Sequence, residues 1–202
     1  GIPRNFYFED VDPDIAAAVR DVAAALGKAG ATIREVELPD ADVAHRYATT
    51  IILADAGPLH ADALDRRRDA ISRQVFERMS KGRSLSGVDY ARAERFREEW
   101  RRMLRGLFTT VDILLVPATP YAAPLIEDGA HLADATRHAT RFTYGGALAG
   151  LPGLSVPCGL TRAGLPIGVL LEAAWFNEAA LLRAGRAWQR MTDWHMRRPE
   201  HA

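Results

Sequence analysis

The sequence has few of the residues on which several classes of protein depend. Its single cysteine, Cys158, cannot form an internal disulfide or a multi-cysteine zinc site, so a reducing cytosol is expected. The 26 Lys and Arg residues equal the 26 Asp and Glu residues, which leaves no net charge to attract nucleic acid or an anionic membrane. The longest apolar runs, such as residues 113–116, are far too short to span a bilayer. These absences favour a cytoplasmic globular protein without a membrane partner.

The length of 202 residues suits one domain or one large piece of a bigger domain. No targeting leader is recognisable before Ile2, and the first residue is Gly1 rather than Met. We therefore expect residues 1–202 to form a single domain piece cut from a longer product.

The first 39 residues predict a strand-helix-strand unit. Asp12 supplies a helix N-cap, and apolar residues then recur at helical spacing until Gly30. Strands are expected on either side, over residues 2–8 and 31–38. This order is typical of a parallel crossover.

Residues 41–108 are predicted to be mainly helical, with a capping-box pattern at Ser86 and Asp89. Between residues 62 and 105 there are thirteen basic and eight acidic residues. A basic patch for tRNA or another polyanion is one interpretation. Because the acids are interleaved throughout, we favour a solvated face with ion pairs, and we do not expect nucleic acid as a partner.

The composition changes at Pro117. Residues 117–168 hold six of the eleven prolines and eight of the sixteen glycines but only six charged residues. Such a stretch predicts tight turns and buried strands, and sites are usually built on such backbone. Within residues 111–172 we expect three apolar strands, over residues 111–116, 154–158 and 167–171, and the last two could form a hairpin. The apolar residues of these two strands are too continuous for a half-exposed sheet. A closing helix capped by Asn177 is expected over residues 177–192. The fold class is α/β, with a mixed sheet flanked by helices.

Six collinear segments carry a more specific pattern. They are I-P-R-N-F-Y-F from Ile2, D-I-L-L-V-P-A-T-P from Asp112, R-F-T-Y from Arg141, G-L-P-G-L-S-V-P-C-G from Gly150, G-L-P-I-G from Gly164 and T-D-W-H from Thr192. Together they resemble the C-terminal portion of the amidase signature family over essentially the whole chain. The resemblance implies the C-terminal part of the amidase signature fold. It also implies an enzyme that hydrolyses carboxamide C–N bonds, or the related A subunit of a tRNA-dependent amidotransferase.

The family's chemistry, as the resemblance implies it, uses a Ser, cis-Ser, Lys triad and an acyl-enzyme, with the triad in the N-terminal half. This chain has only Lys28 and Lys81, and no serine pair in a glycine-rich turn. No catalytic residue is therefore assigned, and we expect the chain alone to be inactive. Its expected partners are the N-terminal half of the same enzyme and a small-molecule amide. No cofactor is expected, and a homo-oligomer is left open.

Other candidate reactive groups favour structural roles. Ser155 lacks flanking glycines on both sides and a following helix, which a nucleophile elbow needs. Cys158 lies among apolar neighbours, as a buried structural thiol does. His131 and His138 bracket Asp134, but the spacing is weak evidence for ligation, and no metal is predicted.

Five residues are candidates for substrate binding: Arg78, Phe142, Thr143, Tyr144 and Gly145. By resemblance, Arg78 lies in an R-x-x-x-G segment that in amidotransferase relatives carries an arginine for a substrate carboxylate, which suits a guanidinium fork. A surface arginine at a helix end explains it equally well. The segment from Phe142 matches a stretch that approaches the reactive centre in the family, where Thr and Tyr hydroxyls beside glycines suit an amide pocket.

Two departures from the family pattern bear on substrate class. Ala147 stands where many relatives have Asn, and Thr140 stands where the amidotransferase relatives carry an acidic residue. The missing carboxylate argues against a glutamine α-amino group as ligand, so a general amidase with an undetermined acyl group is favoured. Two further hypotheses are a non-catalytic scaffold or partner-binding fragment, and a tRNA-linked role through the Arg-rich helices.

Overall fold

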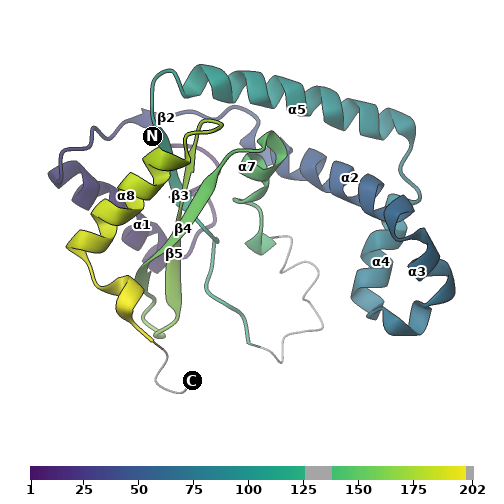
Figure 1. The fold of residues 1–202 in the computed structure, drawn as a ribbon. Helices are drawn as coiled ribbons and strands as arrows, with labels where there is room; N and C mark the ends of the chain where they lie inside the picture. Colours follow the sequence, from purple (N-terminus) through teal and green to yellow (C-terminus); the bar gives the residue numbers. More distant parts are fainter. Residues whose placement is uncertain (126–137, 199–202) are drawn as a thin grey trace.

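The computed structural model describes residues 1–125 and 138–198. A strand-helix-strand unit comes first, a run of helices follows, and the remaining strands come last together with α7 and α8 (Figure 1). The elements, in order, are β1 (Ile2–Pro3), α1 (Pro13–Lys28), β2 (Glu35–Val36), α2 (Ala41–Leu59), α3 (Ala61–Arg66), the 3₁₀ turn η1 (Arg68–Ala70), α4 (Arg73–Gly82), α5 (Gly87–Leu107), β3 (Ile113–Pro117), α7 (Tyr144–Ala149), β4 (Gly153–Leu160), β5 (Pro166–Ala173), α8 (Glu178–Met191) and the 3₁₀ turn η3 (Trp194–Met196).

The strands form two small sheets that meet at the first residue. β3, β5 and β4 are antiparallel in that order, and β1 pairs with β2 in parallel. The Gly1 amino group donates to the Ile113 carbonyl at 2.7 Å, and the Leu115 amide donates to the Gly1 carbonyl at 2.9 Å. The mixed sheet, the hairpin and the parallel crossover predicted from the sequence are confirmed.

Helices pack on both faces of the β3–β5–β4 sheet (Figure 1). α1 and α8 cover one face, and α2, α5 and α7 lie on the other side. Each face has its own apolar cluster. Buried side chains include Ile15, Val19, Val22, Leu171, Leu181 and Trp188 beside α1 and α8, and Tyr7, Leu38, Trp100, Leu104, Leu114 and Phe142 on the opposite side.

Helix starts follow the predicted caps, with one exception. The Asp12 carboxylate accepts from the Asp14 amide at 2.8 Å at the start of α1. At α5 the Ser86 hydroxyl accepts from the Asp89 amide, and the Asp89 carboxylate accepts from the Ser86 amide, which completes the capping box. Asn177 stands at the N-cap of α8, but its side chain makes no capping hydrogen bond, so that part of the prediction is wrong.

The first two strands are much shorter than predicted. The expected strands over residues 2–8 and 31–38 each retain two residues. Phe6 has a φ of 60°, which bends the first segment out of extended backbone. The Asn5 side chain accepts from the Leu38 amide and donates to the Leu38 carbonyl, at 3.0 and 2.8 Å. The Asn5 side chain therefore takes the place of backbone-to-backbone hydrogen bonds at the end of the β1–β2 pair.

β4 is covered on one face only. Val156 and Cys158 are buried beneath α1 and α8, whereas Ser155 and Pro157, which alternate with them, are exposed. The expectation of strands buried on both faces is therefore wrong for β4. Successive side chains along a strand point to opposite sides of the sheet. The helices described here pack against only one side of β4.

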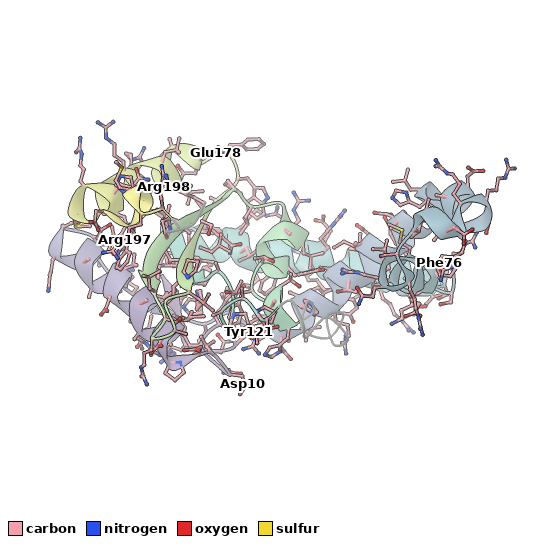
Figure 2. All side chains as sticks on the ribbon, turned by 90° about the horizontal axis from the view of Figure 1, so that it is seen from below. Asp10, Phe76, Tyr121, Glu178, Arg197 and Arg198 are labelled. Atoms are coloured by element: carbon pink, nitrogen blue, oxygen red, sulfur yellow. The ribbon has the colours of Figure 1, made fainter. Side chains whose placement is uncertain are left out.

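The helices α3 and α4 extend the molecule away from the sheet, with Phe76 near the far end (Figure 2). α4 returns against α2, where Gly82 lies in close contact with the Leu53 carbonyl. A side chain at residue 82 would overlap that carbonyl, so the crossing depends on glycine. This crossing sets where α4 and its side chains lie relative to α2.

Candidate functional site

The candidate site is centred on the short helix α7, which α5 and the segment after β5 hold in place. The Trp100 indole on α5 donates to the Gly145 carbonyl at 2.9 Å. The Trp175 indole donates to the Ala149 carbonyl at 3.0 Å, and Gly150 ends the helix with a φ of 75°. Gly145 and Gly146 are both buried, so neighbouring groups approach the helix backbone directly.

Arg78 and Tyr144 meet at this helix although 66 residues separate them in sequence. The Arg78 guanidinium, on α4, donates through Nη2 to the Tyr144 hydroxyl at 3.0 Å. The His45 ring, on α2, packs edge-on against the Tyr144 ring with centroids 4.6 Å apart. Arg78 itself is exposed, and this hydrogen bond uses one of the five N–H donors of its guanidinium group. Two of the sequence-predicted site residues are therefore brought together.

Thr143 lies immediately before α7 and is exposed. Its hydroxyl donates to the Thr140 carbonyl at 3.0 Å and does not cap the helix. Gly145 follows with a buried backbone, its carbonyl already taken by Trp100. Of the side chains in this segment that were predicted to bind substrate, those of Thr143 and Tyr144 carry the hydroxyl groups.

Phe142 lies in the core and not on the surface of the site. Its ring is fully buried and stacks on Tyr7 with centroids 5.3 Å apart, while the Phe6 ring meets it edge-on at 5.6 Å. The Arg141 guanidinium sits 4.7 Å from its centroid and donates to the carbonyls of Glu9 and Asp10. The Phe142 side chain thus supports Thr143 and Tyr144 from below.

One ionisable residue beside α7 was missed by the sequence analysis. Glu172 is 5% exposed, and its carboxyl group lies directly against Gly146. Burial raises the pKa of Glu172 to about 8. Burial, together with the charge of Glu172, also raises the pKa of Tyr7 above its ordinary value. The available signal was a single acid within an otherwise apolar strand, β5.

The other reactive groups stay apart from α7. Cys158 is buried on the α1 and α8 side of the sheet, and burial raises the pKa of its thiol to about 12. Ser155 lies on β4, with no helix directly after it. His131 and Asp134 lie outside the described residues. Within residues 1–125 and 138–198 no group of three or more His, Cys, Asp or Glu side chains is arranged to hold a metal ion.

Ion pairs cover the charged helices. Side-chain pairs one turn apart occur at Arg95 and Glu99 and at Arg73 and Glu77, and Arg83 pairs with Asp65 from another helix. This confirms the predicted solvated face with interleaved charges.

In the part of the chain that the structure describes, no helix is both long and apolar enough to cross a membrane.

Comparison with known proteins places the chain in a family of amide-cleaving enzymes. A family model described as Amidase matches residues 1–182. An amidase from Pseudomonas putida is 32% identical over 206 residues, covering 99% of this chain and 44% of that protein. The glutamyl-tRNA(Gln) amidotransferase A subunit from Roseiflexus castenholzii is 37% identical over 225 residues, covering 99% of this chain and 45% of that protein. The chain belongs to the amidase family and matches its C-terminal portion.

Solved structures agree with this assignment. One chain comes from a structure described as an unexpected vestigial protein complex that reveals the evolutionary origins of an s-triazine catabolic enzyme. It superposes with a TM-score of 0.83 at 30% identity, covering 95% of this chain and 42% of that one. A crystal structure of an amidase gives a TM-score of 0.81 at 25% identity, covering 95% and 44%. The chain therefore has the α/β fold of this family and spans less than half the length of these relatives.

Proposed function

We propose that this chain is a single domain piece that supplies the substrate wall of a cytoplasmic amidase. The full-length enzyme would hydrolyse a carboxamide C–N bond through a Ser, cis-Ser, Lys acyl-enzyme mechanism, with the triad outside this chain. Two findings support a substrate wall in this chain and a catalytic triad outside it: the chain belongs to the amidase family, and it matches less than half the length of each relative. The partners are then a small-molecule amide and the remaining half of the same enzyme.

The observation that carries the proposal is the contact between Arg78 and Tyr144. A guanidinium that is held by one hydroxyl and otherwise exposed retains N–H donors for a carboxylate or a carbonyl. Thr143 adds a second hydroxyl on the same segment, while Phe142 and Gly145 hold that segment from the core. The acyl part of the substrate, or a carboxylate on it, would bind at these groups.

The test uses the full-length enzyme and two amides that differ only in a carboxylate. With Arg78→Ala, KM for the carboxylate-bearing amide should rise roughly 10- to 100-fold, because a hydrogen-bonded charge pair is worth about 1.5–3 kcal/mol. KM for the neutral amide should change little. With Tyr144→Phe, we expect a smaller rise, of about 2- to 10-fold, since a neutral hydrogen bond is weaker.

Arg102→Ala is the matched control, because Arg102 is an exposed arginine on α5 for which the described residues give no ion pair. It should leave KM for both amides unchanged. Equal effects of Arg78→Ala and Arg102→Ala would contradict the proposal for Arg78, and a full-length enzyme that cleaves no amide would contradict the proposed activity itself.

A second candidate function is that of the A subunit in a tRNA-dependent amidotransferase, favoured by the 37% identity to such a protein. Thr140, which stands where the family resemblance implies an acidic residue in amidotransferase A subunits, argues against it. Glutamine-dependent ammonia release by the full-length enzyme, stimulated by charged tRNA, would support it. Hydrolysis of simple amides without glutaminase activity would exclude it.

A further inference from the structure

Glu172 is an acid in a place where neither the family assignment nor the candidate site calls for one. It lies on β5 between Leu171 and Ala173, both of which are buried in the apolar cluster beneath α1 and α8. Its own side chain points to the opposite side of the sheet, toward α7. Burial makes the charged form of a carboxyl group costly, so an acid retained at this 5% exposed position calls for a physical role.

The carboxyl group lies against the first turn of α7. One of its oxygens occupies the space that a Cβ on Gly146 would need, so helix backbone and carboxyl group are in direct contact. On another side of the same turn, the Trp100 indole holds the Gly145 carbonyl at 2.9 Å. The backbone of residues 145 and 146 is therefore fixed by β5 and by α5 together.

Tyr144 immediately precedes these two glycines, so the placement of the turn decides where its hydroxyl lies. That hydroxyl accepts the hydrogen bond from Arg78 at 3.0 Å. A small displacement of the turn would lengthen this hydrogen bond, which weakens steeply with distance and angle.

We propose that Glu172 is a positioning residue, whose neutral carboxyl group packs against Gly146 and thereby holds Tyr144 where Arg78 reaches it. This inference rests on the proposed function of the Arg78 and Tyr144 pair. Ionisation of Glu172 would place an uncompensated charge against the turn and displace it, which weakens substrate binding at mildly alkaline pH.

The surroundings of Glu172 contain little that would offset such a charge. Its register partners on the neighbouring strands, Leu114 and Gly153, are uncharged, and α5 contributes the indole of Trp100. The first segment contributes Tyr7, whose pKa is raised by burial and, once Glu172 is ionised, by the charge of that carboxylate. On α7 the titratable group is Tyr144 itself, and no charged group shifts the pKa of Glu172, which is raised by burial alone.

The experiment compares the full-length enzyme with its Glu172→Gln variant from pH 6 to 9.5. Gln keeps the shape of the carboxyl group and cannot ionise. KM of the parent should rise at least fivefold above about pH 8, whereas KM of Glu172→Gln should stay flat and match the parent at pH 7. In a Tyr144→Phe background this difference should vanish, because the group that Glu172 positions has been removed.

A second readout does not depend on catalysis. The enzyme is labelled with 5-fluorotryptophan, and the Trp100 resonance is assigned with Trp100→Phe. That resonance should shift with a midpoint near pH 8 in the parent and not in Glu172→Gln. If neither KM nor the resonance differs between parent and variant, the positioning role is overturned. If the resonance titrates as expected but no amide is hydrolysed at any pH, the positioning of α7 stands and the proposed activity fails.

Discussion

At the scale of a residue, Glu172 couples the folding of the chain to pH. Its pKa is about 8 in the folded chain and near 4.3 in an unfolded one. A carboxyl group whose pKa is raised by folding keeps its full contribution to stability below the unfolded pKa. It loses that contribution as the pH rises to the folded pKa, because the unfolded state releases the proton first.

We therefore expect Glu172→Gln to gain stability relative to the parent between about pH 4.3 and pH 8. The difference should grow by up to about 1.4 kcal/mol per pH unit and then level off. Thermal unfolding midpoints of the full-length proteins from pH 5 to 9 measure it. Glu178→Gln, which replaces an exposed acid on α8, is the control for the loss of a surface carboxyl group. A constant difference for Glu172→Gln would mean that Glu172 ionises in the folded state as it does in water.

At the scale of elements, the crossing of α2 and α4 connects backbone packing to the site. α4 carries Arg78, and Gly82 in the same helix touches the Leu53 carbonyl. Gly82→Ala must separate the two helices, and overpacking of this kind typically costs about 1–3 kcal/mol. Arg78 would move with α4, so KM for a carboxylate-bearing amide should rise along with the loss of stability.

Gly106→Ala is the matched control for this prediction. Gly106 lies in α5 with open space around its missing side chain, and an alanine there should stabilise the protein by about 0.4–1 kcal/mol. Chemical denaturation and steady-state kinetics of both variants test the pair. A Gly82→Ala enzyme with the stability and KM of the parent would show that the helices can adjust without cost.

The elements differ in how much of them could be predicted. α1, α5 and the β4–β5 hairpin follow from caps, apolar periods and turn residues that lie close together in sequence. The first two strands were overestimated because the Asn5 side chain, 33 residues from Leu38, takes over the backbone hydrogen bonds. The candidate site, too, depends on contacts between residues that are far apart in the sequence. The contact between Arg78 and Tyr144 depends on α2, which packs against both α4 and α7, and no local pattern encodes that arrangement.

At the scale of the whole molecule, the sheet is incompletely covered. β4 pairs with β5 along one edge, and among the described strands none pairs with its other edge. One face of β4 is exposed, and apolar side chains elsewhere are also exposed, including Phe176 at 93% and Leu59 at 78%. The curated relatives are more than twice as long as the segment that matches. We expect additional chain, as in relatives of that length, to cover this edge and these side chains.

The isolated 202 residues should therefore self-associate, because an unpaired strand edge and exposed apolar side chains favour contact between copies. Sedimentation at rising concentration should show increasing mass, and amide hydrolysis should be undetectable, since the catalytic triad is proposed to lie elsewhere. Co-expression with the remaining half of the enzyme should restore both a defined mass and hydrolysis, because partner binding stabilises the folded state. A concentration-independent monomer that unfolds cooperatively would contradict the incomplete-sheet argument. Turnover by the 202 residues alone would instead place the catalytic groups within this chain, with Ser155, Cys158 and the histidines as the first residues to substitute.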